Sequence, residues 1–280
     1  MSKINKENFN EHTLRRLQLT QVEILDEIVR ICDSNNLRYC LIGGTLLGAI
    51  RHKGFIPWDD DLDIAMPRKD YDEFNRICIG GGLNEKYYVH NIISDENYWL
   101  IFAKIRKKNT LYDEENISHL NVNKEIFVDV FPLDETKSEN NKWRTKIIKH
   151  LSNQIYIKRG LKIQQYKKSK ILARLLMPYS IKQLTNWQIK LMTKENKKLG
   201  KYYINYGSNY NTVSQTILKT KYEPFKKAEF EGKLYNIPND ADYVLRRVYN
   251  DYMQLPSEDK RTLRHKPLFI NFGDDISETI

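Results

Sequence analysis

Four aspartates within five residues are the feature of this sequence best suited to chemistry: Asp59, Asp60, Asp61 and Asp63. Residues two apart on a strand point to the same face, so Asp61 and Asp63 should share a face, and Asp59 falls in phase with them. Asp60 should point away, which favours a structural role for it. Hard divalent ions prefer oxygen ligands, and carboxylates this close repel one another unless a cation lies among them. The spacing therefore predicts a site for Mg2+, with Mn2+ as the alternative ion, that can also hold substrate phosphates.

A glycine-rich turn precedes the aspartates and suits phosphate binding. Gly43 and Gly44 let the backbone approach a phosphate closely. Thr45 can cap a short helix that runs through His52, and the free N–H groups of such a helix attract anions. A plain strand-to-helix turn is the alternative, because a Gly-Gly pair alone is a weak signal.

Basic and aromatic residues lie near the glycines and the aspartates. Arg51, His52 and Lys53 could contact phosphates, or each could be a solvated surface charge. Trp58 could wall the pocket and stack on a base or a cationic group, or it could pack in the core. His265 could reach a phosphate, although an exposed loop position is the more usual case.

A further aspartate occupies an apolar strand predicted over residues 125–131 and closed by Pro132. Burying the Asp129 carboxylate without a partner is costly. Asp129 therefore either lies on the exposed face of an edge strand or supplies a third metal-site carboxylate, and we favour the second interpretation. It could also accept the proton of an attacking hydroxyl. We predict Asp61, Asp63 and Asp129 as catalytic metal ligands, with Asp59 as an additional ligand.

The spacing of apolar residues predicts the elements that hold these side chains. The 280 residues are enough for one large domain or two small ones, and 40% of them are apolar, which can support a core. We expect helices over 11–34, 69–78 and 240–249, strands over 37–42, 62–66, 87–91, 98–106 and 125–131, and a hairpin over 230–238.

The net charge of +10 is concentrated in one region. Residues 137–201 contain 18 basic and 2 acidic residues, a net charge of 18 − 2 = +16, so the remainder carries 10 − 16 = −6. This region is predicted to be mainly helical, polar and basic, and its most apolar piece is residues 171–178.

Three cysteines, Cys32, Cys40 and Cys78, show no CxxC spacing and lie in apolar stretches, so we expect buried, reduced thiols in a cytosolic chain. The N-terminus lacks the apolar region of a signal peptide, and no run of 18 apolar residues occurs. We therefore expect neither a signal peptide nor a transmembrane helix.

Four segments resemble the LicD family: Gly43–Asp63, Phe102–Arg106, Phe127–Asp134 and Tyr249–Pro256. The resemblance extends from residue 14 to residue 266. Asn250 stands where the family usually has glycine, a departure that concerns a turn. The resemblance implies an α+β fold with a nucleotidyltransferase-like mixed sheet flanked by helices, to which residues 137–201 add a basic, mostly helical insert.

The resemblance also implies a reaction. It is the Mg2+-dependent transfer of phosphocholine from CDP-choline to a hydroxyl of a cell-surface glycan precursor, of the teichoic acid or lipopolysaccharide type, with release of CMP. Family relatives transfer ribitol phosphate from CDP-ribitol. The carboxylates of the family map onto Asp61, Asp63 and Asp129, and Lys104 in the second segment joins the expected substrate-binding residues. A choline pocket needs aromatic faces, and several tyrosines cluster in sequence, although they fit a packed surface equally well: Tyr202, Tyr203, Tyr206 and Tyr210.

The expected organisation has three parts. Residues 1–136 form the catalytic core, 137–201 the basic helical segment, and 202–280 a C-terminal part that completes the substrate site. The acceptor implied is a lipid-linked glycan precursor, so the enzyme would be cytoplasmic and could contact the anionic inner face of the plasma membrane through 137–201, with Leu172–Met177 dipping in. A solvated helical surface and a groove for a polyanionic acceptor are the alternatives.

Two other functions use the same residues. A template-independent nucleotidyltransferase would need the same carboxylates, but no RNA-binding signature is visible and no nucleic acid partner is expected. A non-catalytic choline- or glycan-binding protein would have no use for so many clustered carboxylates.

Overall fold

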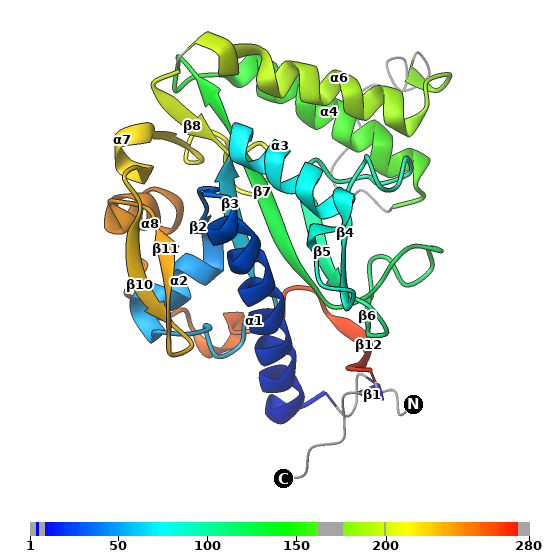
Figure 1. Cartoon of the computed structure of the whole chain (residues 1–280), viewed down its shortest axis with the longest axis vertical. Coiled ribbons are helices and arrows are strands. Elements are labelled where there is room, and N and C mark those ends of the chain that lie inside the picture. The colour runs from blue at the N-terminus through cyan, green and yellow to red at the C-terminus, as the bar shows by residue number, and fades with distance from the viewer. Residues whose placement is uncertain (1–3, 6–8, 162–175, 199, 274–280) are drawn as a thin grey trace.

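A mixed sheet forms the centre of the molecule in the computed structural model, which describes residues 4–5, 9–161, 176–198 and 200–273 (Figure 1). Five strands lie in the order β2 (Cys40–Leu41), β3 (Asp63–Pro67), β7 (Phe127–Thr136), β5 (Ala103–Lys107) and β4 (Tyr87–His90). The end of β7 also pairs with β8 (Tyr202–Ile204), which pairs with β9 (Thr216–Leu218). Only β3 and β7 are parallel among these pairs. The expected α+β class with a mixed sheet flanked by helices is confirmed.

Two helices pack against one face of this sheet, α1 (Glu11–Ser34) and α3 (Arg68–Ile77) (Figure 1). The side chain of Asn10 caps α1 by accepting a hydrogen bond from the Thr13 amide at 2.9 Å. Leucines and isoleucines at helical spacing bury the inner face of α1 in the main core. A short π-helical turn, Cys78–Gly82, follows α3. All three cysteines are buried and free.

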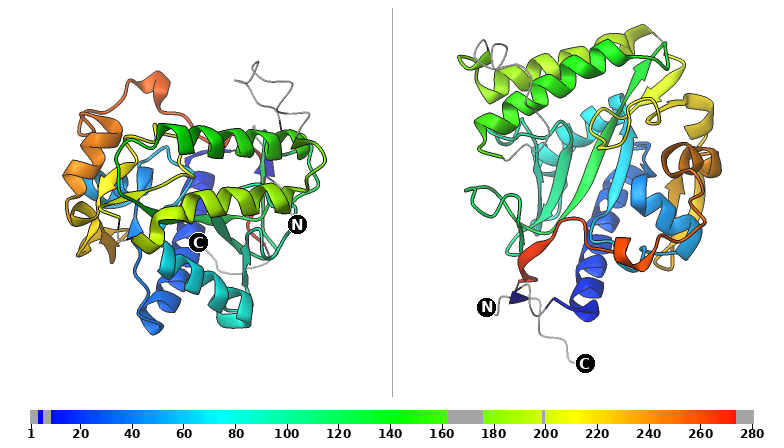
Figure 2. Two further views of the ribbon diagram at one scale, coloured as in Figure 1. Left: turned by 90° about the horizontal axis from the view of Figure 1, so that it is seen from above. Right: turned by 180° about the vertical axis from the view of Figure 1, so that it is seen from behind.

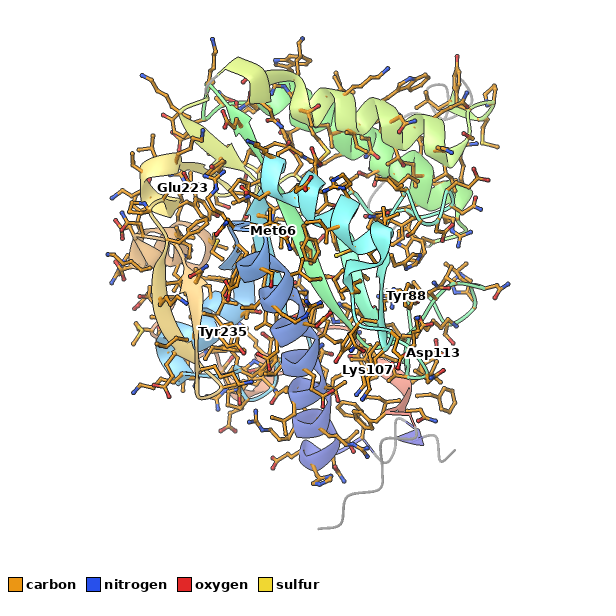
Figure 3. All side chains as sticks on the ribbon, in the orientation of Figure 1. Met66, Tyr88, Lys107, Asp113, Glu223 and Tyr235 are labelled. Atoms are coloured by element: carbon orange, nitrogen blue, oxygen red, sulfur yellow. The ribbon has the colours of Figure 1, made fainter. Side chains whose placement is uncertain are left out.

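The C-terminal part packs around α2 (Gly43–His52). It contains α7 (Lys219–Tyr222), the hairpin of β10 (Lys226–Phe230) and β11 (Lys233–Ile237), α8 (Ala241–Tyr249) and the short turn Glu258–Lys260. Glu231 and Gly232 join the hairpin with φ angles of +51° and +75°, as a two-residue hairpin turn requires. Tyr235 of the hairpin, labelled in Figure 3, donates its hydroxyl to Asp26 of α1 at 2.7 Å. The predicted hairpin and final helix are confirmed.

A second, three-stranded sheet joins the two ends of the described chain. Its order is β1 (Ile4–Asn5), β12 (Pro267–Asn271) and β6 (Leu111–Glu114). β6 was not predicted from the sequence. This small sheet brings residues 264–266, just before β12, close to the central sheet.

Two helices lie side by side at one end of the molecule (Figure 2), α4 (Lys142–Lys158) and α6 (Ile181–Met192). A 3-10 turn, Thr193–Lys198, follows α6. The helices share a small core of their own, separate from the main core, with Trp99 and Ile117. The expected helical character of this region is confirmed for its described residues. Residues 172–175, which belong to the most apolar piece of this region, lie outside the described residues.

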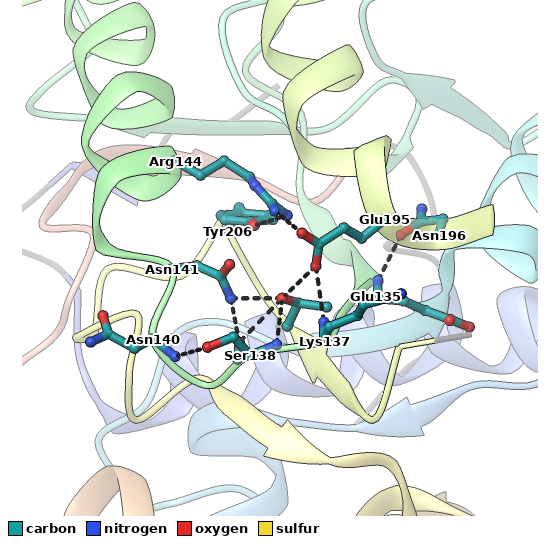
Figure 4. A network of polar contacts seen from close by, with 10 residues as sticks. Glu135, Lys137, Ser138, Asn140, Asn141, Arg144, Glu195, Asn196 and Tyr206 are labelled. Carbon is teal, nitrogen blue, oxygen red and sulfur yellow. Dashed lines mark hydrogen bonds and ion pairs between the residues drawn. The ribbon is translucent and has the colours of Figure 1, made fainter. Parts of the chain in front are cut away.

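The junction between β7 and this helix pair is a polar network (Figure 4). Glu195 accepts hydrogen bonds from the Thr136 hydroxyl at 3.0 Å and the Lys137 amide at 2.9 Å. Glu195 also pairs with Arg144 at the start of α4. One of the two acidic residues of the basic region therefore ties the helix pair to the sheet.

Two predicted strand boundaries are wrong. β7 does not end at Pro132 but continues to Thr136. Pro132 falls between the residues that pair with β5 and those that pair with β8, a gap at which a missing N–H is tolerated. The strand expected over 98–106 begins at Ala103, and Tyr98 and Trp99 are instead buried in a loop.

Replacing Asp134 should destabilise the fold strongly. Arg68 donates to both Asp134 oxygens at 2.8 Å, and the two side chains are 9% and 0% exposed. Removing one member of a buried ion pair costs about 3–5 kcal/mol, so Asp134→Ala should lower the urea midpoint without changing the m-value. The control is Asp72→Ala, because Asp72 is 63% exposed and lies 3.5 Å from the same arginine. An equal loss in both variants would contradict the assignment.

Candidate active site

Three charged side chains stand in a row across three neighbouring strands. Register pairs Asp63 with Asp129 on β3 and β7, and Lys104 with Asp129 on β5 and β7. Lys104 Nζ lies 2.6 Å from Asp129 Oδ1 and 3.2 Å from the ring centroid of Phe127. Asp129 is therefore buried on a central strand, and the alternative of an exposed edge strand is wrong.

Asp59 joins this row from a loop rather than from a strand. β3 begins only at Asp63, and the residues before it are not part of the strand. The amide of Asp129 donates to Leu62 O at 3.0 Å, which continues the β3–β7 contact to Leu62. The expected strand phase thus applies to Asp61 and Asp63, but not to Asp59.

Two glutamines of α1 hold the backbone of the acidic loop. Gln18 Nε2 donates to Asp59 O at 3.0 Å, and Gln21 Nε2 donates to Asp60 O at 2.9 Å. Oxygens of Asp59, Asp60 and Asp61 lie within 4.8 Å of one another. The loop therefore gathers carboxylates that would otherwise move apart.

The glycine pair touches the carboxylates directly. A Cβ at Gly43 would lie 3.0 Å from Asp63 Oδ2, and one at Gly44 would lie 2.5 Å from Asp59 Oδ2. Gly43 also has a φ of +59°, a conformation that disfavours a side chain. α2 begins at Gly43, so the first-turn N–H groups of the helix lie at this carboxylate cluster.

Thr45 does not cap α2, and that prediction is wrong. The capping position is Ile42, and Thr45 is the third residue of the helix. Its buried hydroxyl accepts a hydrogen bond from the Asp63 amide at 2.8 Å. Thr45 therefore fixes the start of β3 against α2.

The basic residues at the C-terminal end of α2 lie away from the carboxylates. α2 is ten residues long, so Arg51 lies about 12 Å along the axis from the glycines. Arg51 donates to Tyr252 O at 2.5 Å and to His52 Nε2 at 2.9 Å. Lys53 is exposed and lies 3.6 Å from Glu229 of the hairpin. These residues connect α2 to the C-terminal part.

Asp60 ties the C-terminal part to the site. It is fully buried and accepts hydrogen bonds from Tyr112 Oη at 3.0 Å and from the Arg264 and His265 amides at 3.2 and 3.0 Å. The imidazole of His265 also contacts this carboxylate, with Nδ1 3.2 Å from Asp60 Oδ1. Although burial opposes the charged form, the hydrogen bond to Asp60 raises the pKa of His265 to about 9. The expected structural role of Asp60 agrees with these contacts, whereas an exposed position for His265 is wrong.

This tether delivers Arg264 to the carboxylates. Arg264 Nη1 lies 3.6 Å from Asp61 Oδ2. Burial alone would lower the pKa of Arg264, but the charges of Asp61 and Asp63 raise it. Two cations thus face the cluster. Lys104 comes from β5, and Arg264 comes from the loop before β12.

The electrostatics of the cluster favour a further cation. Burial, then the charge of Asp61, raises the pKa of Asp59 and that of Asp63 well above their usual range. Burial also lowers the pKa of Lys104, which Asp129 partly offsets. When Asp59, Asp61, Asp63 and Asp129 are ionised, Lys104 and Arg264 leave a net charge of −4 + 2 = −2.

The donor set fits a hard divalent ion. All four candidate ligands are carboxylates, and none is a cysteine or a histidine. One divalent cation would cancel the net charge of −2. Asp60 lies within the same group of oxygens, but its hydrogen bonds to Tyr112 and to residues 264–265 occupy it. Asp59, Asp61, Asp63 and Asp129 would hold Mg2+.

A cavity of about 410 Å³ opens beside the cluster. Asp59 and Arg264 are the charged residues of its lining, and Trp58 is one of the aromatic ones. The guanidinium carbon of Arg261 lies 5.3 Å from the ring centroid of Trp58. The other lining residues come from α2, from the loop after it and from the C-terminal part: Gly44, Leu47, Ile56, Asn209, Tyr210, Tyr249 and Thr262. Tyr210 and Tyr249 meet edge to face with ring centroids 5.2 Å apart. Of the clustered tyrosines, Tyr210 alone is among the lining residues.

Several site residues were not predicted from the sequence. Gln18 and Gln21 show no signal, because any amphipathic helix carries such residues. Tyr249 begins the fourth segment that resembles the family, and Arg264 belongs to a basic triplet, Arg264–Lys266. Those two features could have identified them.

Gly44→Ala should weaken Mg2+ binding while the fold survives. The new Cβ meets the Asp59 carboxylate, which can swing away but then leaves the cluster. We expect about a 10-fold weaker Mg2+ affinity by calorimetry and a small change in Tm. Gly48→Ala is the contrasting variant, because its Cβ would lie 2.4 Å from the backbone oxygen of Gly54 and should lower Tm. Unchanged Mg2+ affinity in Gly44→Ala would contradict the assignment.

Asp59→Asn should stabilise the metal-free protein at high pH. The folded pKa of Asp59 is raised, so the folded state binds a proton that the unfolded chain releases near its usual pKa of about 4, and stability falls as pH rises through the raised pKa. In EDTA we expect the Tm of Asp59→Asn to exceed that of the parent by a few degrees at pH 8 and to match it near pH 4. Added Mg2+ should raise the parent's Tm more than the variant's.

The matched control is Asp259→Asn, the same change at an exposed position. It should leave the pH profile of Tm as in the parent. A parent-like profile for Asp59→Asn as well would show that Asp59 is not part of a repulsive cluster.

Residues 36–162 match the family model described as LicD/FKTN/FKRP, nucleotidyltransferase domain. The chain is also similar to the lipopolysaccharide cholinephosphotransferase LicD of Haemophilus influenzae, with 30% identity over 263 residues that cover 90% of this chain and 96% of the relative. Shorter similarities reach the ribitol 5-phosphate transferase FKRP of human and mouse, each with 44% identity over 43 residues, 15% of this chain and 9% of the relative. The carboxylate cluster, the mixed sheet and the full-length similarity agree: the chain belongs to the LicD family.

Proposed function

We propose that this protein transfers phosphocholine from CDP-choline to a hydroxyl of a cell-surface glycan precursor and releases CMP, with Mg2+ as cofactor. One observation carries the proposal: a cavity with aromatic walls is lined by Asp59, a member of the carboxylate cluster, and by Arg264, which lies 3.6 Å from Asp61 of the same cluster. The full-length similarity to a cholinephosphotransferase supports it.

The lining of the cavity suits the two ends of such a donor. Arg264 can pair with a diphosphate, because a guanidinium forms bidentate hydrogen bonds with phosphate oxygens. Trp58, Tyr210 and Tyr249 offer aromatic faces, the groups that bind a quaternary ammonium. A linear polyol such as ribitol carries no positive charge and so makes no cation–π contact with aromatic faces, which is why the lining favours choline.

The proposed step is an in-line displacement at phosphorus. The acceptor oxygen forms a bond to the phosphorus that carries choline, while the bond from that phosphorus to the bridging oxygen breaks and CMP leaves with this oxygen. The proton of the acceptor hydroxyl passes to Asp129, which Lys104 orients at 2.6 Å. Arg264 stabilises the charge that develops on the leaving phosphate. When bound, Mg2+ would neutralise the diphosphate and the leaving group.

Two other donors are tested by the same assay. The short similarity to FKRP supports ribitol phosphate transfer as an alternative. Nucleotidyl transfer from a nucleoside triphosphate would use the same carboxylates. The proposed acceptor is a lipid-linked precursor of the teichoic acid or lipopolysaccharide type, so we propose that the enzyme acts in the cytoplasm.

A donor screen tests the proposal. The protein is incubated with Mg2+, a glycan acceptor and CDP-choline, CDP-ribitol or nucleoside triphosphates, and the nucleotide products are separated. Among the donors tested, we expect only CDP-choline to yield CMP. We expect no CMP when EDTA removes Mg2+. If CDP-ribitol turns over faster, or if a triphosphate yields pyrophosphate, that reaction replaces phosphocholine transfer as the proposed function.

Two variants locate the chemistry. Asp61→Asn should lower kcat by about 100-fold or more with the Tm maintained, because a carboxylate of the reacting centre is lost. Tyr210→Ala should raise KM for CDP-choline by about 5-fold or more through loss of an aromatic face. Full activity of Asp61→Asn would refute the site, and an unchanged KM in Tyr210→Ala would refute the choline pocket.

A further inference from the structure

The helix pair α4–α6 exposes large apolar side chains. Thirteen large hydrophobic residues are exposed among those that the structure describes, and six of them lie in residues 137–201: Trp143, Ile147, Ile157, Met177, Tyr179 and Trp187. Figure 2 shows the two helices side by side at one end of the molecule, seen from above. Tyr179 and Trp187 meet edge to face with centroids 4.7 Å apart, so part of this apolar surface is an ordered aromatic pair.

The same helices carry exposed lysines without acidic neighbours. Lys142, Lys146, Lys149 and Lys190 are exposed, and no ion pair joins any of them to another described residue. The two acidic residues of the region are already used, because Glu139 pairs with Arg247 and Glu195 with Arg144. Lys182 of α6 lies 3.7 Å from Glu96, but the four lysines named above have no such acidic partner among the described residues, so their positive charge is not compensated by an ion pair.

Charge and apolar exposure together select the partner. A polyanion such as a nucleic acid or a polyphosphate needs the lysines, and nucleic-acid bases can stack on tryptophan, but neither gains from exposed isoleucine and methionine. A bilayer with anionic headgroups attracts clustered lysines and accepts apolar side chains at its interface, where Trp and Tyr are favoured. None of the described helices is long and apolar enough to cross a membrane.

We propose that the helix pair α4–α6 is a docking surface for an anionic lipid bilayer. Lysines contact the headgroups, and Trp187, Tyr179 and Met177 insert at the interface. The inference extends the proposed function, since it states where a lipid-linked acceptor is met, but lipid binding can be measured without any transfer reaction.

Vesicle co-sedimentation of the full chain tests the docking surface. The vesicles are phosphatidylcholine alone or phosphatidylcholine mixed with phosphatidylglycerol. We expect binding to the mixed vesicles that weakens with added salt, and a blue shift of tryptophan fluorescence on binding. Equal binding to both vesicles, or no binding, would overturn the proposal, and binding to soluble polyphosphate with none to vesicles would replace the bilayer by a polyanion.

Charge-reversal variants locate the contact. Lys146→Glu/Lys149→Glu/Lys190→Glu should weaken vesicle affinity by about 10-fold or more. The matched control is Lys226→Glu/Lys227→Glu, which reverses exposed lysines on β10 and should bind like the parent. Equal losses in both variants would show a general charge effect and overturn the assignment to α4–α6.

A third variant separates apolar insertion from charge. Met177→Ser/Trp187→Ser keeps every lysine and should still lose several-fold in vesicle affinity, while parent-like affinity would reduce the contact to charge alone and overturn the insertion. CMP release from CDP-choline with a soluble acceptor should stay at the parent level in all three variants. If CDP-choline is not a donor, the vesicle results still decide the docking surface by themselves.

Discussion

Repulsion among partly buried carboxylates is the constraint on which the rest of this structure depends. Asp59, Asp61, Asp63 and Asp129 would move apart if their backbones were free, and the surrounding structure prevents it. Glutamines of α1 hold the loop by its carbonyl groups, the β3–β7 register sets Asp63 beside Asp129, and the glycine pair lets a helix end come into contact with the carboxylates. The stability lost to this repulsion would be regained on binding the divalent cation that we propose.

The neutralising cations show how fold and site are joined. Lys104 comes from the neighbouring strand and needs only the sheet, whereas Arg264 arrives from a segment more than 200 residues away in sequence. Its arrival depends on Asp60, whose oxygens accept hydrogen bonds from residues 264–265. Within one run of aspartates, three thus belong to the proposed metal-binding cluster, and Asp60 holds the chain segment that brings Arg264 to it.

The sequence predicted which carboxylates make up the site better than it predicted how the surrounding elements are arranged. Spacing alone brought together Asp61 and Asp63, and the cost of burying a lone carboxylate pointed to Asp129. The continuation of β7 beyond Pro132 could not be predicted, because it depends on which neighbours pair with the strand on either side. Arg264 was missed for a related reason: hydrogen bonds between residues so far apart leave no periodic pattern. Arg51, His52 and Lys53 were chosen by type, and the length of α2 carries them away from the carboxylates.

The tether between Asp60 and residues 264–265 has a consequence for biosynthesis. The family model ends at residue 162, yet Tyr210, Tyr249 and Arg264 complete the cavity from beyond that point. During translation the carboxylates therefore emerge from the ribosome long before the arginine that faces them. A nascent chain or a fragment cut at the family boundary carries the acidic cluster without its second cation, so the finished site exists only once nearly the whole sequence has been made.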